Sequence, residues 1–167
     1  VGTNAIIERT GADVGIMVSS SMDGESDPDD LSDFEEFLLE DAVRWIDPDG
    51  EEDEHVKSYL SLSEELCDCI VVAASGPQDE ERVQRTIAEA QPRHQLGSIP
   101  LHLSYDVSRD YDHGRRMTTT TLNAYLHPSL ADFLYRAEDK LREHGFQNPL
   151  LVFCNDGSSN RISRSMA

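Results

Sequence analysis

Short apolar runs alternate with amphipathic stretches along most of the chain. Runs with the length and β-branched content of strands occupy residues 12–18, 69–73, 100–103 and 150–153. Helical spacing of apolar residues covers residues 3–10, 55–66, 75–90, 115–126 and 129–144. Strands that alternate with helices are typical of an α/β fold. We therefore predict one α/β module over residues 1–167, with a mainly parallel sheet flanked by helices and with 12–18, 69–73 and 150–153 as buried strands.

Two further signals set predicted helix boundaries. Ser32-Asp33-Phe34-Glu35 is a capping box, which predicts that an acidic helix begins there. Phe34, Phe37 and Leu38 would form the apolar side of that helix. Pro128 sits where a new helix can begin, so it divides residues 115–144 into two predicted helices.

The acidic charge is concentrated in one part of the chain. The net charge is −19, and between Asp23 and Glu54 sixteen acidic residues stand against one basic residue, Arg44. We predict that residues 20–66 form an acidic, mobile excursion from the α/β pattern. A nucleic acid would be repelled by this charge, so it is not an expected partner.

The cysteines and the apolar runs bear on the compartment. Cys67, Cys69 and Cys154 follow no disulfide spacing, which favours a reducing environment. The Cys67-Asp68-Cys69 stretch predicts thiols at the start of a strand. No apolar run has the length of a membrane span. We predict a cytoplasmic protein with no membrane partner.

Four residues in one loop could meet a hard cation. Asp106, Asp110, Asp112 and His113 lie close together in the sequence. Their spacing lacks the bidentate acid that completes a calcium loop. The alternative is a solvated loop whose acids favour the start of the following helix. No metal ligand is assigned from the sequence.

The segment after the strand at 150–153 is the candidate site. Ligands of α/β proteins dock beyond the carboxyl ends of strands. Asp156 is the candidate catalytic residue, and Asn155, Gly157 and Ser158 are candidate cofactor-binding residues. Gly157 would allow close approach, and Asp156 could hold a metal-bound water or a substrate hydroxyl. The alternative is that these residues form only a turn.

Two sequence blocks carry a family resemblance. The block TNAIIERTGADVGIMVS, residues 3–19, resembles the segment TNALLERKGARVGLITT of the hydantoinase A/5-oxoprolinase family. The block RMTTTTLNAYLHPSLADFLYRAEDKLREHGFQNPLLVFCNDGSS, residues 116–159, resembles that family's RTSTTVLNAYLGP and LLVMQSNGG segments. Their order and separation also match. Residues 22–66 depart most from the family pattern.

The resemblance implies a fold and an activity. Family members have a two-lobed, actin-like ATPase fold, as in acetate kinase, sugar kinases, heat-shock chaperones and actin. They work with a larger hydantoinase B-like subunit, using ATP and a divalent cation, Mg or Mn. They open cyclic amides or carboxylate ketones such as acetone and acetophenone, by phosphorylating an amide or enol oxygen. The stretch NDGSS, in place of SNGG, resembles the ketone carboxylase branch more closely.

The resemblance also implies that this chain is an internal piece of a larger subunit. The family's two glycine-rich phosphate segments would lie outside residues 1–167. We therefore expect the chain alone to bind no cofactor tightly and to hydrolyse no ATP, with the rest of its own subunit among its partners. The alternative from another class is a non-catalytic module that uses its acidic segment to bind a basic partner.

Overall fold

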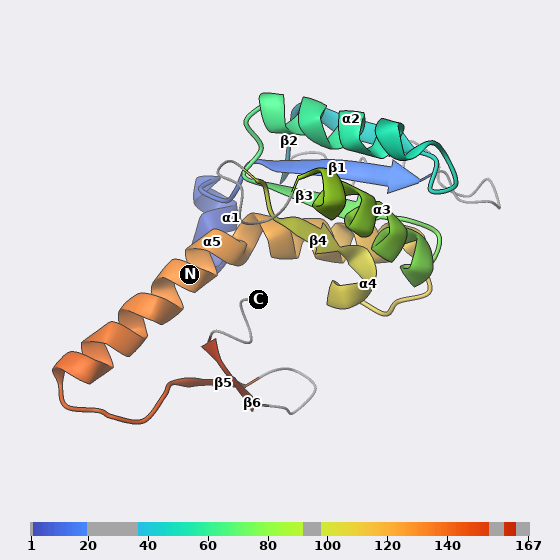
Figure 1. Cartoon of the computed structure of the whole chain (residues 1–167). Helices are drawn as coiled ribbons and strands as arrows, with labels where there is room; N and C mark the ends of the chain where they lie inside the picture. Colours follow the sequence, from blue (N-terminus) through green and yellow to red (C-terminus); the bar gives the residue numbers. More distant parts are fainter. Residues whose placement is uncertain (1, 20–36, 92–97, 154–158, 163–167) are drawn as a thin grey trace. The chain divides into compact units, whose positions relative to one another are not determined.

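The computed structural model describes residues 2–19, 37–91, 98–153 and 159–162 (Figure 1). The chain divides into two compact units. Unit 1 comprises residues 1–11 and 126–167, and unit 2 comprises residues 12–125. The single module expected for residues 1–167 stays a prediction.

Unit 2 is built on a four-stranded parallel sheet in the order β2-β1-β3-β4. The strands are β1 (Val14–Ser19), β2 (Leu38–Ile46), β3 (Cys69–Ala73) and β4 (Leu101–Leu103). Every residue of β1 and β3 is buried, as expected for central parallel strands covered on both faces. The predicted α/β architecture with a parallel sheet flanked by helices is confirmed. Cys69 begins β3, as the sequence predicted.

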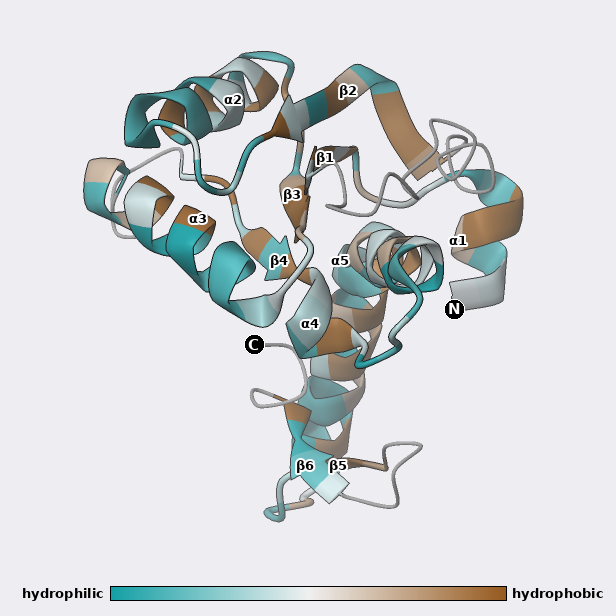
Figure 2. Ribbon diagram, turned by 90° about the vertical axis from the view of Figure 1, so that its right-hand side faces the viewer, coloured by the Kyte–Doolittle hydropathy of each residue, from teal (hydrophilic) through white to brown (hydrophobic). Residues whose placement is uncertain are grey.

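Two helices cover one face of this sheet. They are α2 (Glu52–Glu64) and α3 (Pro77–Ala90), and α3 turns a largely hydrophilic surface outward (Figure 2). The core between these helices and the strands contains Met17, Ala42, Ile46, Tyr59, Leu62, Cys67, Ile70, Val72, Val83, Ile87 and Leu103. Gly15 lies so close to this layer that an added Cβ would stand 2.9 Å from the sulfur of Cys67. A short helix, α4 (Ser104–Val107), follows β4.

The first part of α5 (His113–Glu143) covers the opposite face (Figure 1). In unit 2 it buries Met117, Thr120, Thr121 and Ala124. The predicted division into two helices at Pro128 is wrong, because the helix continues through the proline. Proline has no N–H to donate to the carbonyl of Ala124. That carbonyl accepts instead from the thiol of Cys69, at 4.0 Å.

The predicted acidic helix is wrong where the structure describes it, because residues 38–46 form strand β2. Ala42 and Ile46 are buried, and β2 pairs with β1 from Leu38 onward. The register shifts in its first half, where Asp41 has a positive φ of 61°. This bulge breaks the alternation by which a strand is recognised in a sequence. The capping box lies outside the described residues.

Residues 20–66 were predicted to form an excursion from the α/β pattern. The second part of this segment contains strand β2 and helix α2. Strand β2 is an edge of the sheet, and α2 packs on its face. Arg44 of β2 donates to Ser61 of α2 at 2.8 Å and pairs with Glu65. Residues 20–36 lie outside the described residues, and mobility of the segment stays a prediction.

Unit 1 contains α1 (Gly2–Glu8), residues 126–143 of α5, and the strands β5 (Leu151–Phe153) and β6 (Ser159–Arg161). The prediction of a buried strand at 150–153 is wrong. Strand β5 pairs antiparallel with β6 in a separate two-stranded sheet, and Phe153 is 80% exposed. Apolar composition favours burial, but β6 covers only one edge of β5 and neither of its faces. Across the described ranges, no helix is long and apolar enough to cross a membrane.

Candidate functional site

The carboxyl edge of the sheet in unit 2 gathers polar residues from three strands. Ser19 ends β1, Ser75 follows β3, and Ser104 follows β4. The hydroxyl oxygens of Ser19 and Ser75 lie 3.4 Å apart. Ser75 is exposed, whereas Ser19 and Ser104 are buried. Ligands of α/β proteins bind beyond this edge of the sheet, so these loops are the candidate site of unit 2.

Glu80, in the first turn of α3, lies buried beneath these loops. Its Oε1 accepts hydrogen bonds from the backbone N–H of Ala74, at 3.1 Å, and from the hydroxyl of Ser104. Its Oε2 accepts from the backbone N–H of Tyr105 at 3.0 Å. Burial raises the pKa of Glu80 above its ordinary value, although these hydrogen bonds oppose the shift. One carboxylate thus joins the segment after β3 to the start of α4.

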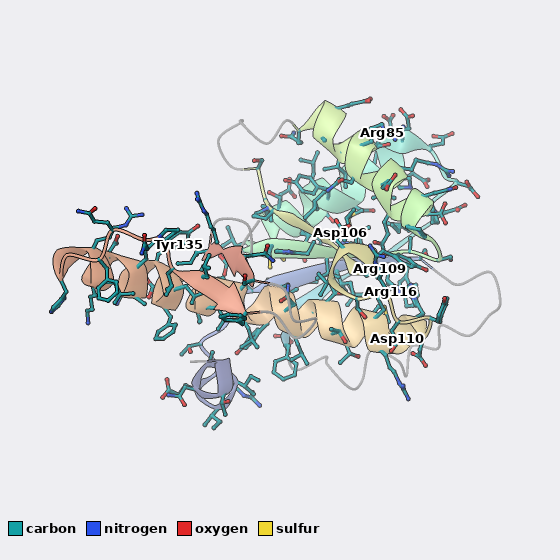
Figure 3. All side chains as sticks on the ribbon, turned by 90° about the horizontal axis from the view of Figure 1, so that it is seen from below. Arg85, Asp106, Arg109, Asp110, Arg116 and Tyr135 are labelled. Carbon is teal, nitrogen blue, oxygen red and sulfur yellow. The ribbon has the colours of Figure 1, made fainter. Side chains whose placement is uncertain are left out.

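Arg116 reaches the same place from the first turns of α5, close to Asp110 (Figure 3). Only 1% of its surface is exposed. Its Nη2 donates to the carbonyl of Ala74 at 3.1 Å, and its Nη1 donates to the carbonyl of Asp110 at 3.0 Å. Its Nε donates to the hydroxyl of Ser104 at 2.9 Å. The guanidinium stacks 3.9 Å above the ring of Tyr105, a favourable cation–π geometry.

Arg116 also contacts His113. Nη2 of Arg116 lies 2.8 Å from Nδ1 of His113. A guanidinium has donors only, so Nδ1 is the acceptor in this hydrogen bond.

The four loop residues considered for a cation do not converge on one. The carboxylate of Asp110 accepts from the N–H of Asp112 at 3.0 Å. The carboxylate of Asp112 accepts from the N–H of Arg115 at 2.9 Å, which is the pattern of an N-cap at the start of α5. Asp106 is exposed and borders a groove along α3. Among the described residues, no group of three or more His, Cys, Asp or Glu is placed to hold a metal ion.

The candidates Asn155, Asp156, Gly157 and Ser158 lie outside the described residues. They connect β5 to β6 along the chain. Their proposed catalytic and cofactor-binding roles stay predictions.

The sequence reasoning missed Glu80 and Arg116, although a signal for both exists. Glu80, Val83 and Ile87 follow one another at helical spacing and are all buried. Arg116, Thr120 and Ala124 do the same on α5. A charged residue on the buried stripe of a helix requires partners, because burying an unpaired charge is costly. Such a position predicts a polar network, but not which residues complete it.

No family model matches the sequence. The acetophenone carboxylase gamma subunit of Aromatoleum aromaticum is 31% identical over 91 residues, which cover 54% of this chain and 12% of that subunit. An uncharacterised protein of Methanocaldococcus jannaschii is 29% identical over 65 residues, 39% of this chain and 10% of that protein. The matched regions therefore span only about an eighth to a tenth of these curated relatives.

Two solved structures share the fold. The nucleotide-free structure of an acetone carboxylase that carries out ATP-dependent acetone carboxylation matches 96% of this chain and 27% of its own, with a TM-score of 0.68 and 18% identity. The ATP-dependent caprolactamase of Pseudomonas jessenii matches 91% of this chain and 25% of its own, with a TM-score of 0.65 and 20% identity. At these identities the likeness concerns the fold.

Proposed function

We propose that this chain is part of an ATP-dependent ketone carboxylase subunit of the acetone or acetophenone carboxylase type. The observation that carries the proposal is the 31% identity with the acetophenone carboxylase gamma subunit. The fold likeness to acetone carboxylase supports the same assignment. In this proposal the chain contributes an α/β module to an actin-like ATPase lobe, and the parent enzyme activates its substrate by phosphorylation.

A cyclic-amide hydrolase subunit is the second candidate. The fold likeness to an ATP-dependent caprolactamase favours it, with a TM-score close to that of acetone carboxylase. In both proposals the parent enzyme uses ATP and a divalent cation, Mg or Mn. The two differ in the nucleophile that attacks the terminal phosphorus of ATP and displaces ADP. It is an enol oxygen of the ketone in the carboxylase and an amide oxygen in the cyclic-amide hydrolase.

The proposed partners are the rest of the chain's own subunit and a larger hydantoinase B-like subunit. Exposed apolar side chains in unit 1 support an interface there. Ile7 is 74% exposed, Phe146 59% and Phe153 80%. A groove of about 530 Å³ between α1 and residues 129–140 of α5 is lined in part by the apolar side chains of Ala5, Phe133 and Ala137. Large exposed apolar surfaces mark interaction sites.

Asp156 is proposed to act in the parent enzyme, with Asn155, Gly157 and Ser158 beside it. Asp156→Asn removes a charge but suits a turn equally well. A loss of turnover of about 100-fold with unchanged stability would support a site role, since that is the usual effect of one positioned acid–base group. Wild-type turnover in this variant would show that residues 155–158 have no catalytic role and form only a turn.

Substrate-dependent ATP hydrolysis tests the proposed function. The natural polypeptide that contains this chain would be purified with its partner subunits and given ATP and Mg or Mn. Hydrolysis that requires acetone or acetophenone together with bicarbonate is the expected result. Hydrolysis that requires a lactam or hydantoin instead would establish the second candidate. Absence of turnover with both substrate classes would contradict both and favour the interaction module.

A further inference from the structure

The backbone of Ala74 is held on both sides by buried charged side chains. Ala74 is the first residue beyond β3, where the ladder of sheet hydrogen bonds ends. Its N–H donates to Glu80 at 3.1 Å, and its C=O accepts from Arg116 at 3.1 Å. A buried backbone group needs a partner, and here the two partners carry opposite charges. The peptide units on either side of Ala74 therefore have fixed orientations.

Ser75, the next residue, is fixed by a third contact. The hydroxyl of Tyr105 donates to the carbonyl of Ser75 at 3.0 Å. The ring of Tyr105 lies under the guanidinium of Arg116, so this contact depends on the same arginine. Ser75 is exposed, although the residue before it is fully buried. The network thus holds the backbone of an exposed serine at the carboxyl edge of the sheet, and the hydroxyl of this serine lies 3.4 Å from that of Ser19.

We propose that Ser75 contacts a polar group of the ligand, and that Glu80, Ser104, Tyr105 and Arg116 are positioning residues that hold Ser75 in place. These four positioning residues form a clamp on the segment Ala74-Ser75. The inference rests on the proposed function, because the ligand is taken to be the substrate or nucleotide of the parent enzyme. A hydroxyl can donate to a carbonyl or phosphoryl oxygen, and both occur in the proposed reaction. Holding a contact group in its productive geometry before binding avoids the cost of ordering it at that moment.

Amide hydrogen exchange on this chain tests the clamp without any assay of activity. Ser104→Ala removes the hydroxyl shared by Glu80 and Arg116 and leaves little empty space. We expect the amides of Ala74 and Tyr105, which both donate to Glu80, to exchange at least about tenfold faster, because hydrogen bonds to charged groups contribute about 1.5 to 3 kcal/mol. The exchange rates of the Val71 and Val72 amides inside β3 should increase less. Ser63→Ala on α2 is the matched control.

Equal exchange at Ala74 and Tyr105 in the wild type and in Ser104→Ala would overturn the clamp. A uniform increase in amide exchange rates throughout unit 2 would also overturn the clamp, because it would indicate a general loss of stability. Tyr105→Phe provides a second variant, since it keeps the ring under Arg116 and removes only the bond to Ser75. Its matched control is Tyr135→Phe, on the exposed part of α5 (Figure 3).

Kinetics of the parent complex test the role of Ser75. Ser75→Ala should lower kcat/KM about tenfold, as expected when a hydrogen bond to the ligand is lost. Ser104→Ala and Tyr105→Phe should lower kcat about fivefold at a temperature at which both variant complexes are fully folded, whereas Ser63→Ala and Tyr135→Phe should match the wild type. Wild-type kinetics in Ser75→Ala would overturn the inference. A wild-type complex without ATP-dependent turnover would instead refute the proposed function, and the exchange rates would still decide the clamp.

Discussion

The carboxylate of Glu80 and the guanidinium of Arg116 share one hydroxyl, that of Ser104, which donates to the carboxylate and accepts from the guanidinium. Both charged groups are buried. Each also binds the backbone of Ala74, so the pair is joined at two places. Removing the charge of Arg116 would leave the buried carboxylate of Glu80 without its counter-charge, and that situation is strongly destabilising.

Arg116→Gln should therefore destabilise unit 2 by about 3 to 5 kcal/mol, the usual cost of removing one partner of a buried pair. Urea unfolding of the chain, followed by circular dichroism, measures the difference. The matched control is Arg85→Gln, because Arg85 is exposed on α3 and loses the same charge (Figure 3). It should change stability by less than about 0.5 kcal/mol. Equal effects of the two substitutions would contradict the role of the buried pair.

The pKa of Glu80 gives this stability a predictable pH dependence. Burial raises the pKa of Glu80 in the folded protein above its ordinary value of 4.5. The folded state then binds the proton more tightly than the unfolded state. The contribution of Glu80 is therefore fully present below pH 4.5 and declines as the pH rises through the folded-state pKa.

Comparison with Glu80→Gln isolates this titration, because glutamine does not ionise. As the pH falls from about 7.5 to about 5, the unfolding free energy of the wild type should rise relative to that of the variant. Glu81→Gln, on the exposed side of α3, should show no such trend. A wild type that loses stability relative to Glu80→Gln over this range would refute the direction of the pKa shift.

The thiols of Cys67 and Cys69 should be almost unreactive in the folded protein. Burial raises the pKa of Cys67 to about 11 and that of Cys69 to about 12, from an ordinary 9.0. Only the thiolate attacks a disulfide reagent, so a rise of two pKa units reduces the reactive fraction about 100-fold. The measurement is thiol titration at pH 8 in a Cys154→Ser variant, where these two thiols remain. The same variant unfolded in urea is the control, and equal rates would contradict the prediction.

The parts of the fold that were predictable from the sequence are those where one periodicity dominates. The uninterrupted apolar runs of β1 and β3 identify buried parallel strands, and the stripe Val83-Ile87 identifies α3. Strand β2 was missed because a bulge at Asp41 displaces its pattern and because two of its exposed positions, Glu40 and Asp41, are acidic. The single helix α5 was missed because tertiary contacts outweigh the local effect of Pro128.

The site in unit 2 was predictable only in part. The carboxyl edge of a parallel sheet is a general location, and the sequence places Ser19 and Ser75 there. The network itself joins Ala74, after β3, to residues from α3, α4 and α5, and no local pattern shows that Glu80 and Arg116 meet at Ser104. For Asp112, the two interpretations from the sequence were a cation ligand and a helix start. Its bond to the N–H of Arg115 assigns it to the start of α5.

Leu66→Gly should stabilise the protein. Leu66 follows the C-cap residue of α2, Glu65, with a left-handed φ of 64°, and its side chain is 80% exposed. An L-residue there costs about 1 to 2 kcal/mol, whereas glycine adopts this conformation readily. Part of the gain is offset by the larger entropy that glycine loses on folding. The expected net gain is about 1 kcal/mol, a rise in thermal midpoint of about 2 to 4 °C.

Two variants at the same position separate backbone strain from side-chain exposure. Leu66→Ala removes most of the exposed apolar surface but keeps the Cβ that the left-handed backbone disfavours, so it should have little effect on the midpoint. Leu66→Asn should fall between alanine and glycine, because asparagine tolerates this conformation. Differential scanning calorimetry of the three variants measures the order. A midpoint of Leu66→Ala as high as that of Leu66→Gly would show that removing the exposed leucine, and not relief of backbone strain, stabilises this end of α2.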